Sequence, residues 1–347
     1  MIVTAREGRL KGHAMKQLAL FVIALHMPVI SSAEQLFPAP QEVIASWQPT
    51  GTNLTARQAN QILSEAVTLN DPGYGTTRIE QTLARLQEQG ELSADMRYVQ
   101  ARVLQRNHQF AASAAVLSDL NDPASRLLLA TVNNNLGQFE KAISVCKSLT
   151  GKVSHTIMLT CLYDARYQQN PDLKLYEQLN SISAKIRSEL NPSQQWWVNS
   201  TLAAMALDQN KPAAALQHLE GLTFDKAPVS TLALWAEAHL QLNQPEPVLE
   251  QLGSQLSSPS ADDAILLVLA RASQLNHGEQ RWLHLAKQRI AQRKWRNDWS
   301  HAAYIAEYYL HIEKNAEQAA YYARKNWEQA KGLADRRLLE QTTGEHL

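Results

Sequence analysis

The chain contains 347 residues, 45% of them hydrophobic, and its 33 basic side chains are balanced by 33 acidic ones. This balance argues against nucleic acid as the general partner, because proteins that bind duplexes carry a clearly basic surface. The length fits one large domain or two ordinary ones, but an array of stacked repeats reaches the same length simply by adding units.

The first 33 residues have the features of an export signal. Lys16 supplies a positive charge, the apolar run Leu18–Leu25 follows it, and small residues precede an expected cleavage after Ala33. A helix that spans a bilayer needs about 20 apolar residues, so this run is too short for a membrane anchor. We therefore expect residues 1–33 to be a signal peptide and the mature protein to be periplasmic, in a Gram-negative-type cell.

The expected mature chain is slightly acidic. The signal contains four basic residues and one acidic residue, so 29 basic and 32 acidic residues are left, for a net charge of −3. The natural start could be Met1 or Met15, and neither choice changes this mature charge. We expect no nucleic-acid partner.

Residues 34–92 are expected to form a lead-in to the main fold. Their first part, residues 34–54, is rich in proline, glutamine and threonine and predicts little regular structure. Two amphipathic helices are predicted after it, at Thr55–Leu69 and Thr77–Gln89. Between them, Asp71–Gly75 has some likeness to a phosphate-binding loop. It lacks the lysine and the preceding apolar strand of such loops, so we interpret it as a plain turn.

From Ser93 onward, apolar residues recur at helical spacing in paired segments joined by short corners. Such short connections make successive helices antiparallel neighbours, and no segment alternates as a strand does, so the prediction is an all-α fold. A short helix at Leu333–Gln341 is expected to close the array. The predicted hairpins are Ala94–Arg106 with Phe110–Leu120, Pro123–Leu136 with Phe139–Leu149, Ser154–Gln168 with Leu173–Leu190, Pro192–Gln209 with Ala213–Leu222, Ser230–Leu242 with Pro245–Leu256, Ala261–Leu275 with Glu279–Lys294, and Asp298–Ile312 with Ala316–Ala330.

One corner sets the pattern for the others. Gly137 lies between the second predicted pair of helices, at a point where the chain commonly requires a positive φ. Glycine adopts this conformation freely, and asparagine tolerates it better than most residues. Similar corners recur 30 to 40 residues apart, and we expect a left-handed residue at each of Asn107, Gly137, Asn170, Asn210, Asn243, Asn276 and Asn315.

Small residues stand where the two helices of the hairpin Pro123–Leu149 would press together. Ala130 on the first helix, Gly137 with Phe139 at the corner, and Ala142 on the second helix match the pattern of a tetratricopeptide repeat. The hairpin therefore resembles that family.

Other hairpins carry the same resemblance to different degrees, over about residues 93–331. Two of them match it with Ala203, Asn210 and Ala215, and with Ala236, Asn243 and Val248. The hairpin Ser154–Leu190 departs from it, because Tyr163 and Leu175 occupy the positions of small residues. With the ending Asn326–Glu340, the whole arrangement also resembles exported bacterial tetratricopeptide proteins of unassigned function.

The resemblance implies a right-handed α-α superhelix whose first helices line a groove for a peptide segment or a partner protein. Residues 332–347 would then be a capping helix and tail. Amide and other polar groups in such a groove suit an extended backbone, although each of them is also ordinary for a solvated helix surface. The positions that the resemblance places in the groove are Tyr98, Arg102, Gln105, Arg106, Leu127, Thr131, Asn134, Asn135, Glu237 and Gln241.

The chain has two cysteines, Cys146 and Cys161. An even number in an exported protein is compatible with a disulfide, and the two predicted helices that carry them pack side by side. The alternative is that both are small buried residues with free thiols.

The familiar signatures of enzymes are missing, so we expect no catalytic residues, no cofactor and no metal ion. His277 and His284 are seven residues apart, but no further ligand lies at a suitable spacing, and we interpret them as surface residues. Asp262 and Asp263 could be paired carboxylates of a glycosidase. Their place at the start of a predicted helix favours a capping role instead.

The segment 280–297 is rich in basic residues, contains no acidic residue, and has tryptophans within and beside it at Trp282, Trp295 and Trp299. One interpretation is a surface for an anionic partner or for lipid head groups. We favour the other, in which the tryptophans anchor the core and the charges are solvated. The basic residues are Arg281, Lys287, Arg289, Arg293, Lys294 and Arg296.

Together these features predict a non-catalytic periplasmic scaffold that binds a peptide segment or a partner protein. Two alternatives remain open. One is a helical-array enzyme that acts on a cell-wall glycan through an acid such as Glu237. The other is a peripheral membrane-surface adaptor that uses the basic helix at residues 281–296.

Overall fold

Helices make up the regular structure of the residues that the computed structural model describes, namely 53–66, 68, 74–186, 190–256, 262–277 and 280–346. Within these ranges there is no β-strand, which confirms the predicted all-α class. All the described residues belong to one unit, Gln48–Leu347. The expected signal peptide, residues 1–33, and the lead-in up to residue 52 lie outside the described residues.

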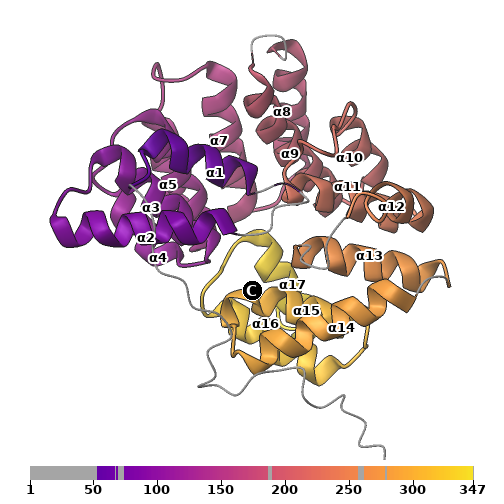
Figure 1. Ribbon diagram of the computed structural model, residues 1–347. Helices are drawn as coiled ribbons and strands as arrows, with labels where there is room; N and C mark the ends of the chain where they lie inside the picture. Colours follow the sequence, from indigo (N-terminus) through magenta and orange to yellow (C-terminus); the bar gives the residue numbers. More distant parts are fainter. Residues whose placement is uncertain are drawn as a thin grey trace, which may run out of the picture. The chain divides into compact units, whose positions relative to one another are not determined.

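The helices follow one another along the chain as a succession of hairpins with short connections (Figure 1). Among the described residues, no helix has both the length and the apolar character needed to cross a membrane. The bounds are α1 (Ala56–Glu65), α2 (Tyr74–Gln89), α3 (Ala94–Arg106), α4 (Phe110–Leu117), α5 (Pro123–Asn135), α6 (Phe139–Lys147), α7 (His155–Gln169), α8 (Leu173–Ile186), α9 (Pro192–Asp208), α10 (Pro212–His218), α11 (Val229–Gln241), α12 (Pro245–Gln251), α13 (Asp263–Leu275), α14 (Gln280–Trp295), α15 (Ala302–His311) with a 3₁₀ turn before it at Trp299–His301, α16 (Ala316–Trp327) and α17 (Leu333–Thr343).

Capping side chains determine where many of the helices begin. Ser93 accepts a hydrogen bond from the backbone N–H of Met96 in α3, and Asp122 accepts one from that of Ser125 in α5. Pro123 occupies the first position of α5, where its missing N–H costs nothing. Such caps satisfy donors that the first turn of a helix leaves unpaired. From α3 to α13, the predicted starts therefore lie within two residues of the observed ones.

Some predicted bounds are wrong. The helix α2 begins at Tyr74, so the last two residues of the expected turn Asp71–Gly75 are helical. The second helices α10 and α12 end at His218 and Gln251, several residues before their predicted ends. Gly221 adopts a φ of +77° shortly after α10, which a continuing helix would not allow.

The left-handed corners are confirmed at Gly137, Asn210 and Asn243, whose φ values are +70°, +54° and +57°. Each is followed by a residue whose N–H bonds a carbonyl five positions earlier, as in Gln138 to Asn133 at 2.8 Å. This bond closes the helix end and requires a left-handed residue just before its donor.

At the other corners the prediction is wrong. The positive φ belongs to His108, His277 and Lys314, each next to the expected asparagine, because the helix-closing geometry and not the local propensity selects the residue. At the corner after α7, Asn170 is extended, with a φ of −144°. The following residue is a proline, which disfavours the helical region for the residue before it.

The first helices of successive hairpins contact one another as well as their own partners, from α3 through α15. The small residues predicted at the close crossings are all buried, which allows the helices to approach. They are Ala130, Ala142, Ala203, Ala215, Ala236 and Val248.

The two cysteines lie at disulfide distance. Cys146 on α6 and Cys161 on α7 have Cα atoms 5.6 Å apart, within the range that a disulfide requires. Both are buried in one apolar cluster with Ala142 and Met158. The bridge crosses from one hairpin to the next, as the predicted pairing of these two helices required.

The C-terminal segment connects helices that are distant in sequence. The backbone N–H of Lys331 donates to the carbonyl of Asn135 at the end of α5, at 2.6 Å. The N–H of Leu333 donates to Oε1 of Gln168 near the end of α7, at 2.8 Å. Both contacts hold the start of α17 against the first helices of earlier hairpins.

Two arginines of α17 extend these contacts. A guanidinium nitrogen of Arg336 donates to the carbonyl of Gln168 at 3.3 Å, and Nε of Arg337 lies 3.1 Å from Oδ1 of Asp208. Gln168 and Asp208 lie at or near the C-terminal ends of α7 and α9. Carbonyl groups there lack helical partners and the helix dipole favours positive charge, so arginine is well suited to both ends.

Replacement of Gly137 by alanine is expected to destabilise the protein more than replacement of Gly151. Both glycines have a positive φ, +70° and +74°, so alanine costs about 1 kcal/mol at either position. A Cβ at Gly137 would also lie 3.0 Å from Cβ of Lys331, whereas one at Gly151 meets nothing within 4 Å. Urea unfolding should give Gly137→Ala an additional loss of about 1–2 kcal/mol. Equal losses would mean that the segment at Lys331 moves aside without cost.

Candidate ligand-binding cavity

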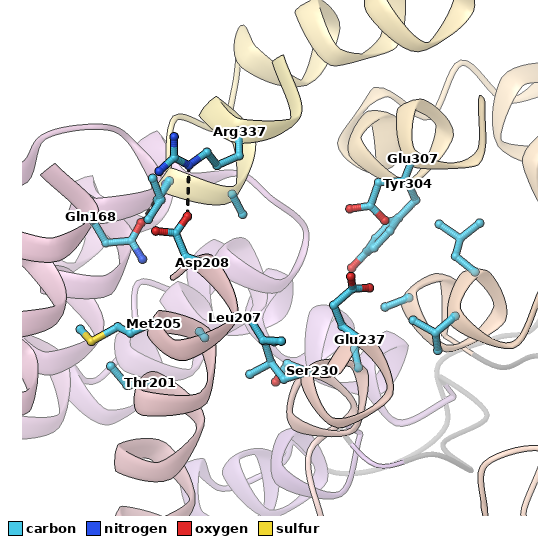
Figure 2. A pocket seen from close by; sticks show the side chains of 18 of the residues that line it. Gln168, Thr201, Met205, Leu207, Asp208, Ser230, Glu237, Tyr304, Glu307 and Arg337 are labelled. Atoms are coloured by element: carbon cyan, nitrogen blue, oxygen red, sulfur yellow. Dashed lines mark hydrogen bonds and ion pairs between the residues drawn. The ribbon is translucent and has the colours of Figure 1, made fainter. Parts of the chain in front are cut away.

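A cavity of about 410 Å³ lies among the helices α7, α9, α11, α13, α15 and α17 (Figure 2). Its volume is within the range of about 300–1,000 Å³ that is usual for ligand pockets. Five of these helices are first helices of successive hairpins, and the sixth is the closing helix. The cavity therefore occurs where the hairpins and the C-terminal segment meet.

Three of the first helices each present one face to the cavity. The contributing positions are spaced i, i+3, i+4 and i+7, which places them on one side of a helix. Most are small or apolar, and the last is charged in each helix. They are Thr201, Ala204, Met205 and Asp208 on α9; Ser230, Ala233, Leu234 and Glu237 on α11; and Ala264, Leu267, Val268 and Arg271 on α13.

Glu237 and Arg271 form a two-point ion pair at the wall of the cavity. The two guanidinium nitrogens of Arg271 lie 2.6 Å and 3.3 Å from the carboxylate oxygens of Glu237, and Gln241 donates a further hydrogen bond. Burial alone would raise the pKa of Glu237, but the charge of Arg271 and these hydrogen bonds outweigh it and lower the pKa. Glu237 is therefore a stable carboxylate.

A second ion pair faces the cavity from the side of α17. Arg337 pairs with Asp208, whose other carboxylate oxygen accepts a 2.7 Å hydrogen bond from the hydroxyl of Tyr167. Burial, followed by this bond to Asp208, raises the pKa of Tyr167, so its hydroxyl stays protonated and donates. Figure 2 shows Asp208 and Arg337 on one side of the cavity, with Glu237 and Glu307 on the other.

Glu307 on α15 is the cavity carboxyl with the fewest partners among the described residues. No hydrogen bond joins it to another described residue, in contrast to Glu237 and Asp208. Burial, with a smaller contribution from the repulsion of Glu237, raises its pKa to about 7. The attraction of Arg271 lowers the pKa but only partly offsets this rise. The protonated form of Glu307 is therefore favoured more than that of an ordinary glutamate.

Asp164 on α7 is the fourth cavity carboxyl. Burial raises its pKa to about 6, although hydrogen bonds from the side chains of Gln168 and Asn134, at 3.4 Å and 3.2 Å, act in the opposite direction. It has amide partners but no ion pair with a described residue. Asp164 and Glu307 thus differ from the two paired carboxylates.

The predicted groove residues fall into two sets. Glu237 lines the cavity described above, and Gln241 lines its continuation toward α17. Asn134 touches the cavity indirectly, through Asp164. Asn135 is bonded by the C-terminal segment, as described above.

The remaining predicted groove residues lie elsewhere on the first helices. Arg102 donates to the side chain of Asn60 on α1 at 2.8 Å, and Arg106 donates to the carbonyl of Ala66 just after α1 at 2.9 Å, so α1 covers this part of α3. These two and Gln105 line a separate small pocket. Tyr98, Leu127 and Thr131 lie on α3 and α5, where Tyr98 and Leu127 pack against the core and Thr131 bonds its own helix.

Three of the six residues of the basic set, all on α14, have partners within the protein. Arg289 and Arg293 both bind the carboxylate of Asp263, at 2.5 Å and 3.0 Å, and Arg293 also binds Asp298 at 2.6 Å. Lys294 donates to the hydroxyl of Tyr309.

The other members of the basic set are exposed. Arg281 lies 4.6 Å from the ring of Trp282, and Lys287 and Arg296 are directed to solvent. Trp282 itself is buried, in line with its predicted anchoring role, whereas Trp295 is 38% exposed.

The two adjacent aspartates have different roles. Asp262 caps α13 and accepts from the N–H of Ala264, as predicted. Asp263 lies in the first turn of α13, as predicted, but its buried carboxylate binds the two arginines of α14 and caps no backbone N–H. His277 and His284 are exposed, and within the described ranges no three His, Cys, Asp or Glu side chains converge as a metal site.

Sequence reasoning missed most of the charged residues of the cavity, among them Asp208, Arg271, Glu307 and Arg337. A signal was present in the first helices. Asp208 is the single charged residue of α9, and Glu307 is the single acidic residue of α15, in a helix that is otherwise mainly apolar. A lone charge among apolar residues requires a partner or a ligand.

Comparison with known proteins provides no assignment for this cavity, since no protein-family model, no curated protein and no solved structure matches the chain.

Replacement of Glu307 by glutamine is expected to stabilise the protein at pH 8 and to have a much smaller effect at pH 5. The carboxyl titrates near 4.5 in an unfolded chain and near 7 in the folded one, so the unfolded state loses its proton first as pH rises. Stability therefore falls between these values, by on the order of 2–3 kcal/mol. Thermal unfolding at both pH values measures the effect.

The matched control is Glu317→Gln, which changes an exposed carboxylate on α16. Glu317 lies in the first turn of α16, so this change should cost no more than about 1 kcal/mol, and nearly the same amount at both pH values. A gain from Glu307→Gln that is equal at pH 5 and pH 8 would show that the titration of this carboxyl is not its cause.

Simultaneous replacement of Arg289 and Arg293 by glutamine is expected to destabilise the protein by about 3–5 kcal/mol, because Asp263 would stay buried without a cation. Lys287→Gln on the same helix removes an exposed charge and should change stability by less than about 0.5 kcal/mol. Urea unfolding compares the two variants. Equal, small effects would mean that these arginines are surface charges available to a partner.

Proposed function

We propose that this protein is a non-catalytic periplasmic scaffold whose tetratricopeptide-like superhelix holds a peptide segment or a partner protein in the central cavity. The observation that carries the proposal is the cavity itself, lined by matching faces of consecutive first helices. Repeat arrays commonly bind partners on the surface formed by their first helices.

The lining has the composition that a bound peptide requires. Apolar side chains from α9, α11 and α13 form most of its surface, and Gln168, Thr201 and Ser230 add neutral polar groups. An amide side chain offers both a donor and an acceptor to an extended backbone, and hydroxyls do the same. The ion pairs Glu237–Arg271 and Asp208–Arg337 fix the positions of charged groups around these polar groups.

One specific observation favours a second function, an enzyme acting on a cell-wall glycan. Two carboxyls of the same cavity differ in protonation, since the pKa of Glu237 is lowered and that of Glu307 is raised to about 7. Glycosidases use such a pair as carboxylate and general acid. The two-point bond of Glu237 to Arg271 leaves this carboxylate poorly available, so we rank the scaffold first.

The membrane-surface adaptor has less support. It requires free positive charges on α14, but Arg289, Arg293 and Lys294 are engaged by partners within the protein. Only the exposed members of the basic set would be left for lipid head groups.

Peptide selection with a cavity-filling variant tests the scaffold. Ala204 on α9 is exposed and lines the cavity, whereas Ala213 on α10, in the same hairpin, is exposed and does not. Peptides selected from a phage-displayed random library on the wild-type protein should bind Ala204→Trp at least about tenfold more weakly, because the indole fills their site. Their binding to Ala213→Trp should be unchanged.

Two results would count against the scaffold. Selected peptides that bind Ala204→Trp as well as wild type would show that the cavity is not their site. Digestion of purified peptidoglycan by the wild-type protein, with loss of that activity in Glu307→Gln, would establish the enzyme instead.

A further inference from the structure

The charges that line the cavity do not balance. Four carboxyls face it, and two arginines face them, each already paired with one of the carboxylates. His311 is the remaining basic group, and burial followed by the repulsion of Arg271 lowers its pKa, so it adds no charge at neutral pH. Among the described lining residues, Asp164 and Glu307 are thus left without a cationic partner.

The surroundings of Glu307 combine a carboxyl with an apolar wall. Leu267 and Val268 from α13 and Leu234 from α11 line the same cavity, and Figure 2 shows Glu307 beside Tyr304 on the side opposite Asp208. A carboxylate in such a place is costly unless a positive charge comes to it. Charge complementarity therefore specifies a cationic ligand with an apolar body.

We propose that the cavity holds a lysine side chain of the bound peptide segment, with its ammonium group on Glu307 and its methylene stem against the apolar wall. This inference rests on the proposed scaffold function and specifies its ligand. A lysine has a compact head on a long unbranched stem, so the stem can lie along the apolar wall while the ammonium group reaches Glu307.

Binding of an ammonium group would be linked to pH. The groups that face Glu307 are Arg271, Glu237, Tyr304 and His311 around the cavity and Asp335 on α17. The ligand binds the ionised carboxyl, so its affinity rises as pH increases toward the pKa of about 7 and levels off above it.

The test uses a short fluorescein-labelled peptide of alanine, leucine and glycine with one central lysine, acetylated at its N-terminus so that no other amine is present. Matched peptides carry Nε-acetyl-lysine or norleucine at the same place. Fluorescence anisotropy at pH 8 should show the lysine peptide binding about tenfold tighter than either neutral peptide. The preference should disappear in Glu307→Gln and persist in Glu317→Gln.

The other outcomes distinguish failure of the lysine site from failure of the scaffold function. Equal binding of the lysine and norleucine peptides, or a lysine preference that survives Glu307→Gln, overturns the lysine site. If none of the three peptides binds while library-selected peptides do, the lysine site is wrong and the scaffold function stands. If no peptide of any origin binds, the scaffold function fails as well.

Discussion

The contacts of the C-terminal segment with the ends of earlier helices are the constraint on which the cavity depends. The hydrogen bonds of Lys331 and Leu333 to α5 and α7, and the ion pair of Arg337 with α9, hold α17 across helices that are distant in sequence. Leu333, Ala334 and Arg337 of this eleven-residue helix line the cavity beside the faces of α9, α11 and α13.

A second contact also joins helices that are distant in sequence. The rings of His108, at the corner after α3, and His301, before α15, are stacked with centroids 5.8 Å apart. His301 in turn bonds Asp298, which binds Arg293 of α14. The first regular hairpin and the last one are thus connected through side chains, in addition to the contacts between neighbouring helices.

The elements of the fold followed from the sequence because they are determined locally. Caps such as Asp122 and corners such as Gly137 lie within a few residues of the bonds that they make, and the pairing of Cys146 with Cys161 needed only the order of two neighbouring helices. The corner at Asn170 failed for an equally local reason, the proline that follows it.

The cavity could not be predicted in the same way. Asp208 and Arg337 are 129 positions apart, and nothing in the sequence near either residue indicates the other. The resemblance to the repeat family predicted which helices line a groove, and Glu237, one of the residues named for that groove, lines the cavity. It does not specify which other helices meet these positions: α1 contacts Arg102, whereas Glu237 and Arg271 face a cavity that α17 also lines.

Two carboxyls of the protein, Asp263 and Glu307, differ in whether a cationic side chain neutralises them. This difference bears on the binding role proposed for the cavity. Asp263 is buried, and two arginines satisfy it, as expected for a charge that serves the fold. Glu307 is half-buried and lines the cavity with no such partner among the described residues, and burial raises its pKa. A structural requirement explains the first carboxylate but not the second. A ligand that carries a positive charge, as proposed above, would remove the cost of ionising Glu307.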